Sequence, residues 1–316
     1  MHITRKNGPT TRSRQKNGPT TRSRKKNGPQ NLLYSQNPKA PQQTPGGNGC
    51  GIFLIEFLLY DAQGKETTAS GGDDQRLLLA VSYLTENFEH MEGSSTLAVV
   101  ADIAKVKEVW CYPKSKIPER FPSGTKPLVR GRFTFTPSSL WNLQPVSPKH
   151  TGFLSDFEIM WGFTMLREKF PRIFYVDTYF VYFLGILLDG KLNFEKGARF
   201  FKEFNRKQCN TIIVPVNVDS QHWYAFKVLL DQGVTPGDKQ NFSIELVDGL
   251  PKMKVTPPRN TIAKDIKVFF EWLLADPQSQ VTKQKRKKFE PFTTQRLIQQ
   301  GQLVPYNCSS SSNGQS

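Results

Sequence analysis

Cysteine and histidine are both scarce in this chain of 316 residues, which contains four of each. No two cysteines form a Cys-x-x-Cys pair, and no cluster of cysteine and histidine has the spacing of a zinc site. Four cysteines are too few for a disulfide framework in a chain of this length, which favours a reducing compartment. We therefore expect neither a metal nor another cofactor, and a location in the nucleus or the cytoplasm.

Long apolar runs are also missing. No stretch approaches the roughly 20 apolar residues that a membrane-spanning helix needs, and the basic N-terminal region lacks the apolar core of a secretory signal. The chain nevertheless has enough apolar material for a buried core, because 12% of its residues are aromatic and 23 are phenylalanine. We therefore expect a globular protein with no membrane partner.

Acidic residues are absent from the first 30 positions, which hold nine lysines and arginines. The motif Lys-Asn-Gly-Pro-Thr-Thr-Arg-Ser-Arg occurs at residues 6–14 and again at 16–24, and a third, broken copy follows. Asn-Gly-Pro interrupts helices and strands, and almost nothing in this region can be buried. The pattern predicts that residues 1–40 are a disordered basic arm.

Positive charge is concentrated a second time, in the five lysines and arginines of residues 283–288. This cluster is either a nuclear localisation signal or a solvated basic loop. The net charge of +16 favours acidic partners, so nucleic acid or an acidic protein is a candidate partner of the basic arm. The serine-rich residues 309–316 are predicted to be a disordered tail.

The region between the arm and the tail, residues 41–308, is predicted to be a single domain of the α+β class. An apolar run at residues 50–60 lacks a polar face and predicts a buried helix, and Ser155 with Glu158 is a capping box that starts another. Further helices are predicted at residues 75–90, 176–188 and 261–275, and strands at 211–218, 222–230 and 242–247. These elements predict a mixed central sheet with helices packed on it and a helical lobe from about residue 150.

Cys50 begins the apolar helix and stands between Gly49 and Gly51, which allow the backbone to turn tightly. A sulfur at this position lies at the positive end of the helix dipole, which favours the thiolate form. Cys50 is therefore a candidate nucleophile. The alternative is a cysteine that acts only as a small buried apolar residue.

His222 and Asp248 are the candidate partners of this nucleophile. His222 begins one predicted strand, and Asp248 follows the end of the next. Adjacent antiparallel strands bring such positions to one edge of a sheet, where a carboxylate can orient an imidazole that accepts the proton of a thiol. The alternatives are an ordinary histidine at the end of a sheet and an aspartate in a turn before Gly249.

The residues around these positions resemble the ubiquitin-like-protein-specific protease family, which includes the SUMO-deconjugating enzymes. Residues 214–228 contain Val-Pro-Val-Asn and His-Trp, and residues 244–250 read Ile-Glu-Leu-Val-Asp-Gly-Leu, as in the family's histidine and aspartate strands. Pro-Gln-Gln and Asn-Gly-Cys-Gly-Ile-Phe in residues 41–53 resemble the nucleophile motif, and residues 152–159 resemble the segment that opens the substrate-binding lobe. The resemblance implies a papain-like cysteine protease core in which Trp223 packs beside the histidine.

The order of the motifs differs from that of the family, in which the histidine and the aspartate precede the cysteine. Here the nucleophile segment, residues 41–90, comes before the histidine and aspartate segment, residues 150–308. This order predicts a circular permutation, and a faulty gene model that spans two tandem copies would give the same order. Cys308 would restore the family order, but no apolar helix follows it to bury and orient it.

The resemblance also implies a residue that stabilises the oxyanion and residues that bind substrate. Gln43 is the best match to the oxyanion glutamine, with Gln42 and Gln315 as alternatives. Phe153, which replaces a tryptophan of the family, and Asp156 match the substrate-binding segment, and Trp223 is the third expected substrate-binding residue.

The function expected from the resemblance is that of a cysteine peptidase or isopeptidase that removes ubiquitin-like, SUMO-type modifiers from proteins. Its expected partners are a ubiquitin-like protein or its conjugates. Two alternatives remain. One is a catalytically inactive, protease-like basic binding module derived from a mobile element, and the other is an acyltransferase that uses the same three residues.

Overall fold

The computed structural model describes a folded unit that begins at Leu33. The predicted basic cluster, the predicted tail, Cys308 and most of the predicted arm lie outside the residues that it describes. The described residues are 33–37, 40, 49–66, 72–92, 97–121, 128–130, 133–145, 147, 150–186, 192–218, 222–231, 242–252, 254–255 and 257–275.

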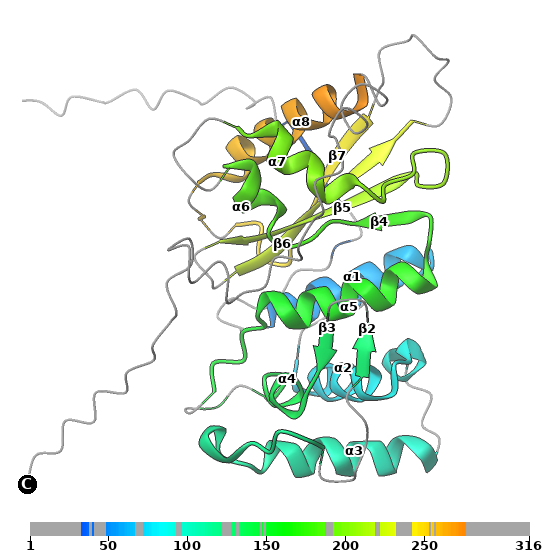
Figure 1. The fold of residues 1–316 in the computed structure, drawn as a ribbon, viewed down its shortest axis with the longest axis vertical. Coiled ribbons are helices and arrows are strands. Elements are labelled where there is room, and N and C mark those ends of the chain that lie inside the picture. Colours follow the sequence, from blue (N-terminus) through cyan, green and yellow to red (C-terminus); the bar gives the residue numbers. More distant parts are fainter. Residues whose placement is uncertain are drawn as a thin grey trace, which may run out of the picture. The chain divides into compact units, whose positions relative to one another are not determined.

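A five-stranded mixed sheet is the centre of this unit (Figure 1). Its strands are β1 (Ser35–Gln36), β4 (Ile173–Tyr175), β5 (Thr211–Val218), β6 (His222–Leu230) and β7 (Phe242–Val247). The order is β1-β7-β6-β5-β4, in which β5, β6 and β7 are antiparallel neighbours, whereas β4 runs parallel to β5 and β1 parallel to β7. The short strands β2 (Leu128–Arg130) and β3 (Phe133–Phe135) pair separately. The α+β class, the mixed sheet and the bounds of the three long strands are confirmed.

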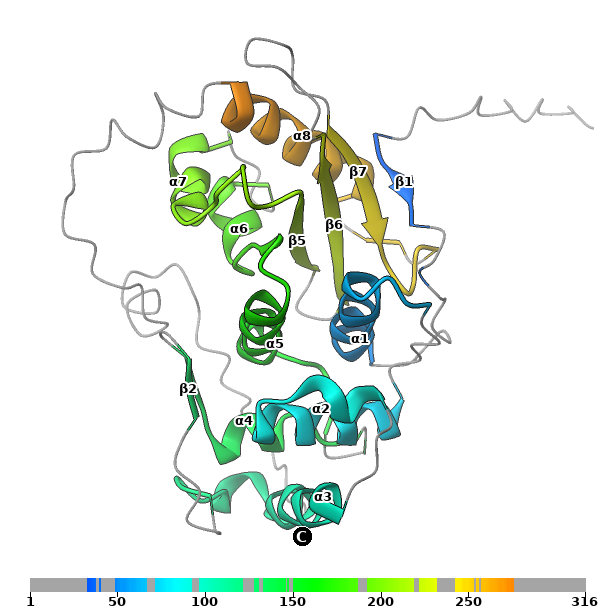
Figure 2. The same ribbon diagram turned by 90° about the vertical axis from the view of Figure 1, so that its right-hand side faces the viewer.

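Helix α1 (Cys50–Ala62) is buried because protein surrounds it on several sides. It contacts β6, α2 (Asp73–Thr85) and α5 (Asp156–Lys169), and Figure 2 shows it beside α5, between the sheet and α2. All ten residues from 50 to 59 are buried, the charged Glu56 among them. The apolar sequence of this helix therefore matches its surroundings, and the predicted buried helix is confirmed.

The helical lobe begins earlier in the chain than the expected residue 150. After α2 come the 3₁₀ helix η1 (Phe88–Glu92), α3 (Leu97–Trp110), the 3₁₀ helix η2 (Lys114–Lys116) and α4 (Pro137–Trp141). Two tryptophans connect these elements, because Trp110 Nε1 donates to the Leu140 carbonyl and Trp141 Nε1 donates to the Tyr112 carbonyl, both at 2.9 Å. The expected start of the lobe is therefore wrong, since the helices that precede residue 150 share one apolar core with α1 and α5.

The opposite face of the sheet is covered by α6 (Phe180–Leu184), α7 (Phe194–Ala198), the 3₁₀ helix η3 (Arg199–Phe201) and α8 (Arg259–Ala275) (Figure 1). Phenylalanine rings fill the space between them, and the Phe180 ring lies 5.3 Å from that of Phe201 and 5.0 Å from that of Phe269. The helix expected at residues 176–188 is shorter because Gly185, with φ of 91°, ends α6. Helix α8 begins two residues before its predicted start.

Part of the predicted disordered arm belongs to the folded unit. Residues 35 and 36 form β1 on the edge of β7, and the Asn37 N–H donates to the Leu246 carbonyl at 3.0 Å. The Tyr34 ring packs edge-on against Phe226, 5.7 Å away, and Ala40 is buried in the core. The boundary at residue 40 is therefore wrong. A two-residue strand held by its partner carries too little sequence pattern to be recognised.

A substitution at Gly162 on α5 tests how closely the helices pack. A Cβ atom at this position would lie 2.2 Å from the Tyr83 hydroxyl and 2.8 Å from Ile55 Cδ1. We expect Gly162→Ala to lower the free energy of unfolding by about 1–3 kcal/mol, measured by urea denaturation.

Tyr83→Phe removes the nearer of these two atoms and provides the matched background. We expect Gly162→Ala to be less destabilising there than in the wild-type chain. An equal loss of unfolding free energy in both backgrounds would show that the contact with the Tyr83 hydroxyl does not limit the packing.

Candidate active site

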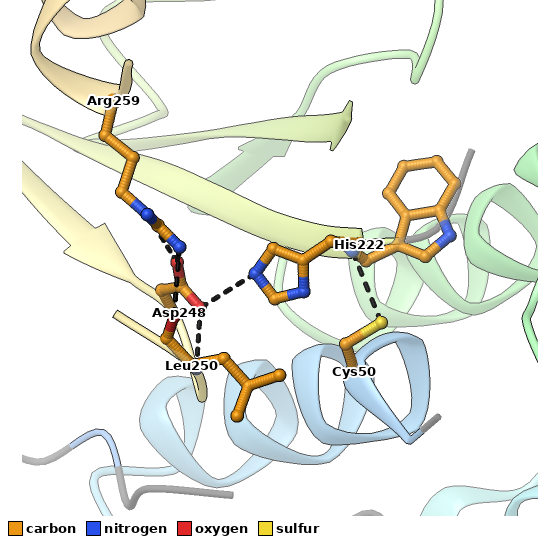
Figure 3. Close-up of polar contacts among 6 residues, drawn as sticks. Cys50, His222, Asp248, Leu250 and Arg259 are labelled. Atoms are coloured by element: carbon orange, nitrogen blue, oxygen red, sulfur yellow. Dashed lines mark hydrogen bonds and ion pairs between the residues drawn. The ribbon is translucent and has the colours of Figure 1, made fainter. Parts of the chain in front are cut away.

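Cys50 is the first residue of α1, at the end of the helix where backbone N–H groups lack partners within the helix. Its Sγ accepts a hydrogen bond from the Trp223 N–H at 3.3 Å (Figure 3). The residue exposes only 3% of its surface. The sulfur is thus joined to the strand that carries His222, in the positive potential at the start of a helix.

The close approach of the segment before α5 explains why residue 51 is a glycine. A Cβ atom on Gly51 would lie 3.1 Å from three side-chain carbons of Leu154. The Leu154 carbonyl in turn accepts a hydrogen bond from Trp223 Nε1 at 2.8 Å. Leu154 therefore connects the start of α1 to Trp223, which is itself buried.

Two of the three predicted substrate-binding residues lie on either side of Leu154, and the third, Trp223, donates to its carbonyl. Phe153 is partly buried, and Asp156 is the first residue of α5. Burial is the main cause that raises the pKa of Asp156. The segment therefore lies beside Cys50, and the Leu154 carbonyl, a group that the sequence did not single out, accepts its hydrogen bond from Trp223.

His222 is the first residue of β6 and is oriented by Asp248. Its Nε2 lies 3.0 Å from Asp248 Oδ1, and the other ring nitrogen is on the side that faces Cys50 (Figure 3). Burial alone lowers the pKa of His222, but hydrogen bonds to Asp248 and Cys50 outweigh burial and raise the pKa to about 9. The imidazole thus stands between the Cys50 sulfur and the Asp248 carboxylate, and a negative charge on either group favours the imidazolium.

Asp248 directly follows β7 and exposes none of its surface. Besides His222, the Leu250 N–H donates to Oδ1 at 2.7 Å, and Arg259 Nε donates to Oδ2 at 2.6 Å. Burial raises the pKa of Asp248, but His222, Arg259 and the Leu250 N–H outweigh it and hold the pKa below its ordinary value. The carboxylate is therefore ionised although it is fully buried.

Two buried arginines at this site were not found from the sequence. Arg259, at the start of α8, pairs with Asp248, and the sequence did not mark it because the predicted helix began two residues later. Arg76 of α2 donates to the Gly152 carbonyl at 2.7 Å and interacts electrostatically with Cys50 and with Asp73. No signal in the sequence distinguishes Arg76 from a surface arginine of an amphipathic helix.

The three predicted catalytic side chains that the structure describes are therefore brought together. Gln43, expected to stabilise the oxyanion, and its alternatives Gln42 and Gln315 lie outside the described residues. With the three groups in this order, the imidazole can take the proton of the thiol, and the resulting thiolate can act as a nucleophile.

Comparisons with protein-family models, curated proteins and solved structures find no match to this chain. Within the described residues, no group of three or more histidine, cysteine or acidic side chains could hold a metal ion. None of the helices in these residues has the length and apolar character to span a membrane.

The raised pKa of His222 predicts how stability depends on pH. Because the pKa is about 9 in the folded chain and 6.5 ordinarily, protonated His222 stabilises the fold fully below about pH 6.5, and this contribution is lost as pH rises to about 9. We expect the free energy of unfolding to fall over this window in urea denaturation.

His222→Gln is the control because every other titrating group is retained. We expect a smaller fall between pH 6.5 and 9 in this variant than in the wild type. An identical pH dependence in the two proteins would show that His222 is not stabilised in its protonated form.

Proposed function

We propose that this protein is a cysteine peptidase or isopeptidase that removes ubiquitin-like, SUMO-type modifiers from proteins. The observation that carries the proposal is the row of Cys50, His222 and Asp248, in which His222 Nε2 lies 3.0 Å from the carboxylate and the opposite side of the ring faces the sulfur. A cysteine that serves only packing needs neither a histidine nor an ionised carboxylate beside it. Burial disfavours the charged forms of His222 and Asp248. The presence of two such costly groups beside Cys50 therefore supports a chemical role for the site.

In the proposed mechanism, His222 accepts the thiol proton and the Cys50 thiolate attacks the carbonyl carbon of the scissile bond. The N–H groups of the first turn of α1 stabilise the oxyanion, and Gln43 is the expected second donor. His222 then donates its proton to the leaving amine, and a thioester with Cys50 remains. Water, deprotonated by His222, hydrolyses the thioester, while Asp248 holds the imidazole in place throughout.

The substrate class follows from the motifs around the site. The segment that resembles the substrate-binding segment of the ubiquitin-like-protein-specific proteases contacts the start of α1 and Trp223 through Leu154.

We also propose that the core is papain-like and circularly permuted. The nucleophile helix precedes the other parts of the site in the chain but packs on β6, and a permutation leaves such packed elements unchanged.

The burial of Cys50 favours a second candidate, the catalytically inactive binding module. With 3% of Cys50 exposed, a substrate carbonyl reaches the sulfur only if the groups that cover it move. A module that binds ubiquitin-like proteins without cleaving them needs no such movement. The two candidates therefore differ in whether Cys50 forms a covalent bond with a bound modifier.

Covalent labelling distinguishes the active peptidase from the inactive binding module. A SUMO-type protein with an electrophile in place of its C-terminal carboxylate reacts only with an active-site thiol that it reaches by specific binding. We expect a single adduct on Cys50 by mass spectrometry, and we expect Cys50→Ala to abolish both the adduct and the cleavage of SUMO conjugates.

Cys111, which is exposed, provides the matched control. We expect the Cys111→Ala variant to be labelled like the wild type. Binding of the probe without an adduct would favour the inactive module, and an adduct that survives Cys50→Ala would exclude Cys50 as the nucleophile.

A further inference from the structure

The side of Asp248 that faces away from His222 is occupied by Arg259. Arg259 Nε and Nη2 lie 2.6 and 2.5 Å from Asp248 Oδ2, and both nitrogens therefore contact the same oxygen (Figure 3). Oδ1 is left to accept from His222 and from the Leu250 N–H. The arginine thus determines which carboxylate oxygen faces the imidazole.

Arg259 is itself held in place from several directions. Its Nη2 donates to the Leu250 carbonyl at 3.0 Å, and its guanidinium lies 5.3 Å from the centre of the Tyr224 ring. The residue exposes 8% of its surface. A planar guanidinium fixed on one side by a ring and on another by a carbonyl has little freedom to follow a carboxylate that rotates, so it orients Asp248 and is not oriented by it.

The charges of the row explain why such a cation matters. With Arg259, the state that contains a thiolate, an imidazolium and a carboxylate has two positive and two negative groups. Without Arg259, the same state has an excess negative charge, whereas a neutral thiol beside an imidazolium–carboxylate pair is balanced. Since excess charge is costly in a buried site, Arg259 favours ionisation of the thiol.

Other ionisable groups near the row do not replace this cation. Arg76 lies on the side of Cys50, interacts with Asp73 and donates hydrogen bonds to the Gln144 and Gly152 carbonyls. Tyr34 and Tyr224 lie near Asp248 and Arg259, and burial raises the pKa of both hydroxyls, which keeps them neutral. Arg259 is the guanidinium that contacts Asp248 directly.

We propose that Arg259 is a positioning residue, which keeps Asp248 ionised with Oδ1 on His222 and thereby favours the Cys50 thiolate and the His222 imidazolium. The proposal rests on the thiol chemistry of Cys50 in the proposed function, but it requires no particular substrate. Alkylation of Cys50 by iodoacetamide therefore tests it separately from peptidase activity.

The test measures the alkylation rate of Cys50 against pH, with each modified cysteine identified by mass spectrometry. We expect Arg259→Gln to lower the rate at pH 7 by at least about tenfold and to move the acidic limb of the profile upward by about one pH unit. We expect Arg259→Lys to recover part of the rate, because it restores the charge without the two-nitrogen contact. A folded Arg259→Gln protein with the wild-type rate and profile would overturn the proposal.

Two further variants separate positioning from loss of stability. Ile262→Val shortens a buried side chain on the same helix without removing a charge, and we expect it to leave the profile unchanged. Asp248→Asn with Arg259→Gln leaves no buried unpaired charge. We expect this double variant to react no more slowly than Asp248→Asn alone, because Arg259 acts through Asp248, and a further loss would contradict that route. Altered alkylation without any cleavage of SUMO conjugates would retain this proposal and contradict the substrate class.

Discussion

The ionised carboxylate of Asp248, which has no exposed surface, is the constraint on which the rest of the site depends. A buried charge is stable only when fixed donors replace the water that it has lost. His222, the Leu250 backbone and Arg259 supply these donors from β6, the turn after β7 and the start of α8. The need to compensate one charge therefore fixes the relative positions of three elements and turns the imidazole toward Cys50.

The same row of charges connects the two apolar cores of the folded unit. Helix α1 belongs to the core that contains Trp223 and Leu154, whereas Tyr224 belongs to the core that contains α8. Polar groups at the end of the sheet join these cores, because Trp223 donates to Cys50 while Arg259 lies over Tyr224. Stability and the proposed chemistry are coupled here, since a substitution that moves either core also moves one end of the row.

The sequence predicted those elements that have a strong local signal. The strands β5, β6 and β7 are apolar and bounded by polar residues, and the Ser155 capping box marked the start of α5, so their bounds were recovered. The approach of Cys50 to His222 and Asp248 was inferred from motifs. The edge strand β1 and the partner Arg259 were missed because long-range contacts, which leave little local pattern, define both.

The central claim is that Cys50, His222 and Asp248 act as one coupled row, and the pKa of His222 tests it most directly. Ring ¹⁵N chemical shifts of His222, followed by NMR against pH in the wild type and in Cys50→Ala, report the protonation of this ring. We predict a pKa of about 9 for His222 in the wild type and a lower pKa in Cys50→Ala, because the interaction with the sulfur is lost. The same pKa in both proteins, near the ordinary value of about 6.5, would contradict the coupling.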